Sequence, residues 1–72
     1  MEIKIGGRYR HYKGMEYVVH NVVRHSETLE WMVFYECQYE NPSGQFWVRP
    51  REMFLEEVQI KGEWLPRFAL IS

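Results

Sequence analysis

The residue types most able to do chemistry in this 72-residue chain gather in one run, Arg24-His25-Ser26-Glu27-Thr28. The run separates two apolar segments, so it should form a loop, and loops on a rigid scaffold often carry function. A serine beside a histidine suggests a nucleophile, yet nucleophilic catalysis needs a base within hydrogen-bond reach and a third, orienting group. The alternative is that Ser26 satisfies amides of its own loop. The run is therefore a candidate binding site, with a structural loop as the competing interpretation.

A second candidate group combines an arginine with an aromatic ring. Trp47 and Arg49 are two residues apart in a segment with the pattern of a strand, so they should share one face. An exposed tryptophan flanked by arginine is a common recognition anchor. A hairpin turn centred on Pro42-Ser43 would set Arg49 opposite Glu36, and a surface ion pair between them is the competing role. The same register sets Trp47 opposite Gln38.

Other polar residues give weaker signals. Metal ligands could come from His11, His20, His25 and Cys37, but their spacing matches no paired Cys or His pattern, so neither a metal nor a cofactor is expected. The segment 8–13 interleaves basic and aromatic residues, as in nucleic-acid binders that stack bases on rings. A net charge of -1 argues against a dedicated nucleic-acid binder, because such proteins usually carry a clear basic excess.

Length and composition limit where these residues can lie. A chain of 72 residues supports one core, so a single domain over residues 1–72 is expected. Apolar residues make up 46% and aromatic residues 17%, which is enough for a dense core, and the single cysteine, Cys37, allows no internal disulfide. That lone thiol, the lack of an apolar stretch of about 20 residues and an N-terminus without a signal-peptide pattern favour a cytoplasmic protein with no membrane contact.

The elements that must position these groups are short strands separated by turns. Strands are expected near residues 8–11, 15–24, 31–39, 45–49 and 57–60, with one helical turn at 50–54 that begins at a proline. In the second strand the apolar residues change face at His20-Asn21, which indicates a bulge or a sharp bend. Asn41-Pro42-Ser43-Gly44 fits a type I turn, and Lys61-Gly62 turns the chain into a last segment, 64–71, which Pro66 restricts to a sheet edge.

The expected fold is mostly β: a small antiparallel barrel, similar to the Src-homology-three type, with five to six strands and one short helical turn. The order of four strands, a helical turn and a further strand or two favours it. An open, strongly twisted antiparallel sheet is the alternative, because the pattern does not say how the first and last strands meet. The core is expected to contain Tyr17, Val19, Val33, Tyr35, Cys37, Phe46, Val48, Phe54, Leu55, Val58 and Ile60.

Several blocks of residues also carry a family resemblance. They are 7–14, 24–30, 47–50 and Met53-Phe54 with Glu56, and together they resemble a family of small bacterial proteins, domain of unknown function 1653. The resemblance spans roughly residues 7–71. It implies a bacterial source, and it implies no activity, substrate or cofactor that could be carried over to particular residues.

The expected function is a non-catalytic binding module for an anionic or planar ligand. The expected register brings the ends of two hairpins to one pole of the domain, and the ligand-binding residues are expected to be Arg24, His25, Ser26, Glu27, Tyr35, Trp47 and Arg49. One alternative is a small enzyme or regulatory subunit acting on a phosphorylated metabolite, with His25 and Glu27 as acid and base. Another is an accessory domain that binds nucleic acid or docks a protein partner. A homodimer could enclose a ligand pocket for which one short chain has little volume.

Overall fold

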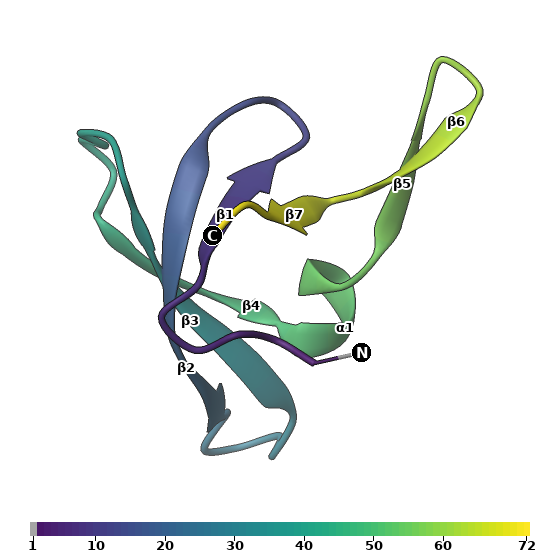
Figure 1. Ribbon diagram of the computed structural model, residues 1–72. Coiled ribbons are helices and arrows are strands. Elements are labelled where there is room, and N and C mark those ends of the chain that lie inside the picture. Colours follow the sequence, from purple (N-terminus) through teal and green to yellow (C-terminus); the bar gives the residue numbers. More distant parts are fainter. Residues whose placement is uncertain (1) are drawn as a thin grey trace.

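The structure, a computed structural model, describes residues 2–72, and over that range the chain forms seven strands and one short helix (Figure 1). In chain order these elements are β1 (Arg8–His11), β2 (Glu16–Arg24), β3 (Trp31–Cys37), β4 (Phe46–Pro50), α1 (Arg51–Phe54), β5 (Glu57–Ile60), β6 (Glu63–Pro66) and β7 (Phe68–Leu70). The five expected strands and the helical turn are confirmed to within two residues at each end. The last segment holds two strands, β6 and β7.

The fold is mostly β, but the expected barrel does not close over the described residues. Five strands form one antiparallel sheet in the order β4-β3-β2-β1-β7, and β5 and β6 form a separate two-stranded sheet. β4 and β7 therefore remain free edges, and the alternative of an open, twisted sheet describes the molecule better. Figure 1 shows the β5–β6 hairpin projecting away from the five-stranded sheet. Within residues 2–72 no helix is long and apolar enough to span a membrane.

The chain passes from the small sheet to the large one at Arg67. The amide of Arg67 donates to the carbonyl of Glu56 (2.9 Å), and its carbonyl accepts from the amide of Tyr12 (3.0 Å). Before this residue the chain pairs with β5, and after it the chain pairs with β1. Pro66, which has no amide hydrogen to donate, ends β6 next to this junction. The junction therefore holds the two sheets together through Arg67.

β2 contains the bulge that its sequence predicts. The register between β2 and β3 shifts between Val19 and Asn21, so His20 is the extra residue. On the other side of β2, the amide of Val19 donates to the carbonyl of Gly7 (3.0 Å). A Cβ atom on Gly7 would lie 2.8 Å from the carbonyl oxygen of Lys4, so the close approach of Lys4 to Gly7 requires glycine at position 7. The N-terminal segment is thereby tied to β2 at its bend.

The register of β3 and β4 differs from the expected one. Arg49 lies opposite Val33 rather than Glu36, a displacement of three residues along β3. An odd displacement moves every β4 side chain to the other face of the sheet. The expected pairing of Arg49 with Glu36 is therefore wrong, and the two side chains lie on opposite faces. The expected partner of Trp47 is wrong for the same reason, because Trp47 lies opposite Tyr35.

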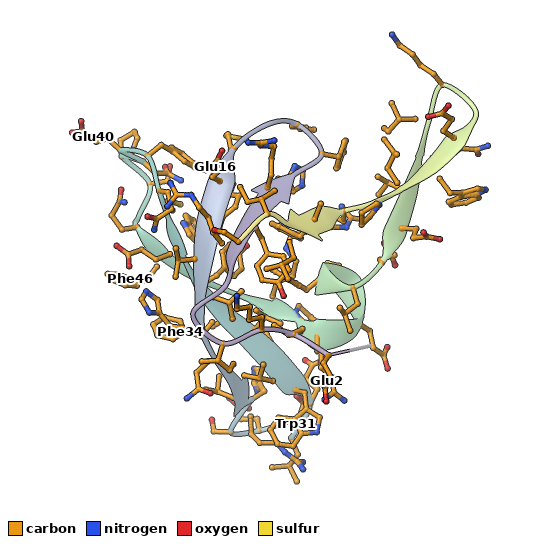
Figure 2. The ribbon with its side chains drawn as sticks, in the orientation of Figure 1. Glu2, Glu16, Trp31, Phe34, Glu40 and Phe46 are labelled. Carbon is orange, nitrogen blue, oxygen red and sulfur yellow. The ribbon has the colours of Figure 1, made fainter. Side chains whose placement is uncertain are left out.

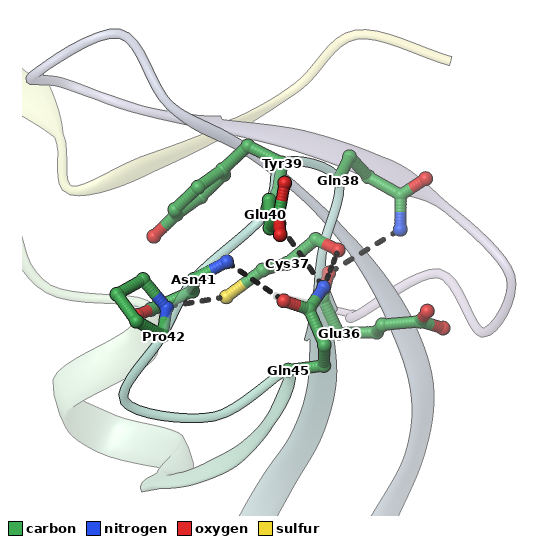
Figure 3. A pocket seen from close by; sticks show the side chains of 8 residues that line it. All are labelled: Glu36, Cys37, Gln38, Tyr39, Glu40, Asn41, Pro42 and Gln45. Carbon is green, nitrogen blue, oxygen red and sulfur yellow. Dashed lines mark hydrogen bonds between the residues drawn. The ribbon is translucent and has the colours of Figure 1, made fainter.

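The cause is an off-centre turn in the β3–β4 connection. The turn at 41–44 forms as expected, with the amide of Gly44 donating to the carbonyl of Asn41 (3.0 Å) and Gly44 at φ 139°. The side chain of Gln45 closes the rest of the loop (Figure 3). Its Nε2 donates to the carbonyls of Cys37 (3.2 Å) and Tyr39 (3.0 Å), while its Oε1 accepts from the amide of Asn41 (2.8 Å). Strand pairing is consequently centred on the first residue of the turn rather than on its middle.

The core lies on the inner face of the five-stranded sheet. Its buried members among the described residues are Tyr9, Tyr17, Val19, Met32, Val33, Tyr35, Cys37, Phe54 and Phe68. Six of the residues expected in the core are confirmed as buried, whereas Phe46 and Val48 are 58% and 54% exposed. The displaced register explains this error, since it turns both side chains to the outer face, where Phe34 and Phe46 lie together in Figure 2. Leu55, Val58 and Ile60 are only half-buried.

Candidate functional site

The loop between β2 and β3 uses His25 to hold its own backbone. Nδ1 of His25 accepts hydrogen bonds from the amides of Glu27 (3.1 Å) and Thr28 (3.3 Å). The amide of Leu29 donates to the carbonyl of His25 (2.9 Å), with Leu29 in the left-handed region at φ 64°. The side chains of Ser26 and Glu27 are exposed. One ring nitrogen of His25 is therefore engaged in loop structure.

Arg24 is also engaged, at the end of the sheet nearest that loop. Its guanidinium lies 4.0 Å from the centre of the Trp31 ring, and its Nη1 donates to the carbonyl of Leu29 (3.0 Å). Arg51, the first residue of α1, lies 5.6 Å from the same ring. Trp31 borders two surface hollows, of about 520 and 210 Å³, and the acidic residues that line them are Glu2, Glu30 and Glu52. Figure 2 shows Glu2 and Trp31 at the same end of the molecule. An anion at this end would meet those carboxylates, which disfavours it as an anion site.

Two further expected binding residues belong to the core and to a turn. Tyr35 is buried, with its ring edge-to-face against Tyr17 at 5.2 Å between centroids. Trp47 donates its Nε1–H to the carbonyl of Gly44 (2.9 Å), and its ring packs against that glycine. Trp47 is nevertheless 38% exposed on the inner face of β4. The Trp47 ring is therefore accessible to a ligand, whereas Tyr35 belongs to the hydrophobic core.

The polar hollow over the β3–β4 loop offers little to a ligand. It measures about 680 Å³ and is lined by residues 36–42 and Gln45 (Figure 3). The polar groups that line it largely bond to one another: Gln45 binds three backbone groups of the loop, and Nδ2 of Asn41 donates to Sγ of Cys37 (3.6 Å). The hydroxyl groups of Tyr39 and Tyr17 are 3.0 Å apart, and this bond raises the pKa of Tyr39, with burial adding to the effect. These groups serve the loop rather than a ligand.

Arg49 directs its charge at an aromatic ring instead of a carboxylate. Its guanidinium lies 5.3 Å from the centre of the Phe68 ring. None of the four ion pairs within residues 2–72 involves it. Glu36, its expected partner, lies on the other face of the sheet and contacts Nε2 of His20 (2.6 Å). Arg49 is half-buried, so its charge is partly desolvated, and no carboxylate among residues 2–72 pairs with it.

Arg67, the residue before Phe68, carries a second half-buried guanidinium. Its Nη2 binds Oε1 of Glu56 (2.7 Å), and its side chain is only 21% exposed. Its Nε–H is buried and has no hydrogen-bond partner among the described residues. A buried donor without a partner costs about 1–3 kcal/mol, so such groups are rare and require an explanation.

The positive charges of both arginines affect the pKa of His11. Its ring lies edge-to-face against Phe68, at 4.9 Å between centroids. Burial lowers the pKa of His11 below its ordinary value of 6.5, and the positive charges of Arg49, Arg67 and Lys13 lower it further. Nδ1 of His11 accepts from the amide of Lys13 (3.2 Å), so the neutral ring carries its proton on Nε2. The surroundings of Phe68 are therefore locally positive although the whole chain is not.

We call the group of His11, Arg49 and Arg67 around Phe68 the Phe68 site. β1, β4 and the junction of β6 with β7 each supply one of its polar residues. Guanidinium groups bind carboxylates and phosphates through short, charge-assisted hydrogen bonds, so this arrangement suits an anion. Of the ligand-binding residues expected from the sequence, the Phe68 site contains Arg49, and Trp47 lies on the same face of β4. Arg24 lies elsewhere, against Trp31, as does Arg51.

Sequence reasoning missed two members of the Phe68 site. Arg67 follows Pro66 in a segment whose partner strands could not be assigned, and His11 was considered only for nucleic-acid or metal binding. Their proximity results from the pairing of β1 with β7, which places His11 directly opposite Phe68. That contact joins the two ends of the chain, and no local pattern encodes it.

The fold and the site define a small, open antiparallel β domain with a cationic, aromatic-backed surface site. The chain belongs to the family described as Protein of unknown function (DUF1653), whose model matches residues 7–70. It is similar to a crystal structure of a protein of this family from Bordetella bronchiseptica, with a TM-score of 0.88 and 32% sequence identity, covering 94% of this chain and 87% of that chain. No curated protein matches the chain significantly. The resemblance noted in the sequence is confirmed.

Proposed function

We propose that this chain is a non-catalytic binding module whose ligand is an anion, held at the Phe68 site by Arg49 and Arg67. The observation that carries the proposal is the buried Nε–H of Arg67, which has no hydrogen-bond partner among residues 2–72, together with a half-buried Arg49 that has no carboxylate partner in the same range. The charges of both arginines act on His11. A phosphate or carboxylate group would accept charge-assisted hydrogen bonds from both guanidinium groups. It would also offset the positive charge that lowers the pKa of His11.

A planar group on the same ligand would find a surface in Trp47. The indole shares the inner face of β4 with Arg49, two residues away, and its Nε1–H is already bonded to Gly44. Its remaining exposed surface is therefore aromatic, and a flat ring could stack on it. This supports an anionic ligand that also carries a planar group.

The alternative functions have less support. Arg8 and Arg10, which a nucleic-acid role would use, both bind Glu16, at 2.7 and 2.9 Å. An enzyme with His25 and Glu27 as acid and base would need a ring whose Nδ1 is bonded to loop amides. We further propose, from the sequence, a single-domain cytoplasmic protein of bacterial origin, related to barrels of the Src-homology-three type by its order of elements.

Titration of isotope-labelled protein with sulfate, followed by amide NMR shifts, tests the proposal. Sulfate keeps its charge over the range in which histidine titrates. We expect saturable shifts centred on His11, Arg49, Arg67 and Phe68, and a pKa of His11 that rises in the complex. Binding should then tighten as pH falls through that pKa, because protonation and anion binding favour each other. Arg49→Gln should weaken sulfate binding about tenfold, since a hydrogen bond to a charged group contributes about 1.5 kcal/mol.

Arg10→Gln is the matched control, because it removes one cation from the opposite face of β1, where Arg10 binds Glu16. This variant should bind sulfate as tightly as the unchanged protein. Equal weakening in Arg49→Gln and Arg10→Gln would mean that sulfate responds only to total charge. Shifts centred on Trp31 instead of Phe68 would place the anion at the other cluster. Either result contradicts the proposal.

A further inference from the structure

β4 is an edge strand with an unusually apolar exposed surface. Among the described residues it pairs with β3 alone. Its first three residues are all large, apolar and exposed: Phe46 is 58%, Trp47 38% and Val48 54% accessible. Phe46 stacks on Phe34 at 5.8 Å between centroids, on the outer side of the sheet (Figure 2). Folded proteins usually cover or charge such an edge, because its unpaired backbone groups can template pairing with another strand.

The free edge of β4 presents a defined set of backbone groups. The amide of Cys37 donates to the carbonyl of Gln45 (2.8 Å), and bonding residues alternate along an antiparallel ladder. Gln45 and every second residue after it are therefore bonded to β3. Phe46 and Val48 direct both their N–H and C=O groups to the open edge. Pro50 has no N–H, and as the N-cap of α1 its C=O accepts the first bond of that helix. The edge thus offers two donors and two acceptors to an incoming strand.

We propose that the chain forms a symmetric homodimer by antiparallel pairing of β4 with β4 of a second copy. A pair of identical antiparallel strands is self-complementary, so one contact closes the dimer and leaves neither copy with a free β4 edge. The two five-stranded sheets then join into one continuous sheet. The backbone edge and the outer face of β4 carry this inference, and its test at Val48 changes no residue of the Phe68 site.

Side-chain complementarity selects the register in which Val48 lies opposite Val48 of the other copy. In that register the two valines exchange a pair of backbone hydrogen bonds, and Phe46 of each copy lies opposite Pro50 of the other. Trp47 of each copy lies opposite Arg49 of the other, which forms a cation–π pair across the strands. A register centred on Arg49 would instead set two like charges opposite each other, which is unfavourable.

One strand pair is a small interface, so the dimer should dissociate reversibly and its fraction should rise with protein concentration. Sedimentation velocity over a wide concentration range measures this. Val48→Pro removes an edge N–H that the β3–β4 ladder does not use, and Pro is compatible with an edge strand. Val48→Lys would place two lysines, one from each copy, opposite each other, and their like charges would oppose pairing. Both variants should remain monomeric at concentrations where the unchanged protein dimerises, with circular dichroism confirming that each is folded.

A disulfide tests the register directly. In a hydrogen-bonded antiparallel pair the Cα atoms are about 5.5 Å apart, which is within reach of a disulfide. Val48→Cys should therefore form a covalent dimer on mild oxidation. The unchanged protein, whose single cysteine Cys37 is buried, should not.

Leu70→Lys is the matched control, because Leu70 is 50% exposed on β7, the other free edge of the same sheet. It should leave self-association unchanged. The proposal is overturned if the unchanged protein stays monomeric at every concentration. It is also overturned if Leu70→Lys dissociates the dimer while Val48→Pro does not, since β7 would then be the interface.

Discussion

Whether a polar side chain can serve a ligand depends, in this protein, on the bonds that it has already made. His25 has the residue type and loop position of a functional group, yet its Nδ1 accepts two amides of its own loop. Arg49 belongs to the same expected set, and its guanidinium meets only an aromatic ring among the described residues. The sequence names both residues. The sequence does not show which of these two side chains remains available to a ligand, because that depends on the left-handed turn at Leu29 and on the register of β4.

Gln45 is the single side chain on which the β3–β4 connection most depends. Its Nε2 donates to two carbonyl oxygens, those of Cys37 and Tyr39. Gln45→Glu keeps the shape but replaces both donors by an acceptor, so a carboxylate would face two carbonyl groups. We expect a loss of about 2 kcal/mol in the free energy of unfolding, measured with urea at neutral pH, because unsatisfied and opposed polar groups cost about that much.

Gln38→Glu provides the control, because Nε2 of Gln38 makes one long, exposed bond to the carbonyl of Glu36 (3.4 Å). This change should alter the free energy of unfolding by less than about 0.5 kcal/mol. Lowering the pH should restore part of the loss in Gln45→Glu, since a protonated carboxyl regains a donor. Equal losses in the two variants, or no recovery in acid, would contradict the role given to Gln45.

At the scale of elements, local chemistry was enough to predict the bounds of the first five strands and of the helical turn, but not the division of the last segment into β6 and β7. The β-branched run of β2 and the turn glycines, Gly44 at φ 139° and Gly62 at φ 82°, behave as their residue types predict. The bulge at His20 was visible as a change of face in the apolar pattern. Each of these features is set by neighbours in sequence.

What the sequence did not reveal is how strands meet. The turn at 41–44 forms as expected, but the strands pair about its first residue, and this displacement moves Phe46 and Val48 from the core to the outer face. No local pattern reveals it. The same limit applies to barrel closure. β7 pairs with β1 and not with β4, and this depends on the bend of the whole sheet rather than on any one segment. The Phe68 site depends on three such contacts between separate segments, so only part of it could be predicted from the sequence.

The corrected register makes a prediction for two valines on opposite faces of the sheet. Val33 is fully buried and Val48 is exposed. Val→Thr keeps the side-chain shape and adds a hydroxyl, which costs about 1–3 kcal/mol when it is buried without a partner. Val33→Thr should therefore lose at least about 1 kcal/mol of unfolding free energy, and Val48→Thr less than about 0.5 kcal/mol. Urea unfolding at low protein concentration measures both, and a larger loss at Val48 would restore the register expected from the sequence.

At the scale of the whole molecule, the near-zero net charge conceals an uneven arrangement. At the Phe68 site Arg67 binds Glu56 while Arg49 has no carboxylate partner among residues 2–72, whereas Arg8 and Arg10 on the outer face share Glu16. Each region lowers the pKa of one group. At the Phe68 site, burial and the positive charges lower the pKa of His11. On the outer face, hydrogen bonds from Arg8 and Arg10 lower the pKa of Glu16. Folding therefore disfavours the protonated form at both positions.

These two shifts predict how stability depends on pH. Where the folded pKa is the lower one, the unfolded chain binds more protons between the two values, so stability falls as pH falls. The contribution of His11 is complete above pH 6.5, its ordinary pKa, and is lost as pH falls from there through its lowered folded pKa. The contribution of Glu16 is complete above pH 4.5 and is lost below it in the same way. Unfolding free energies measured with urea across this range should decline in two steps.

The upper step also connects stability to the anion site. His11→Gln should remove the decline that begins near pH 6.5 and leave the lower one, and Glu16→Gln should do the reverse. Sulfate, bound between Arg49 and Arg67, would offset the charges that hold the pKa of His11 down. It would therefore stabilise the protein more at lower pH and flatten the upper step, while the lower step, on the other face of the sheet, would keep its slope. A stability that is constant or rises as pH falls from neutral through the His11 range would show that the positive surroundings of Phe68 do not act on His11 as inferred.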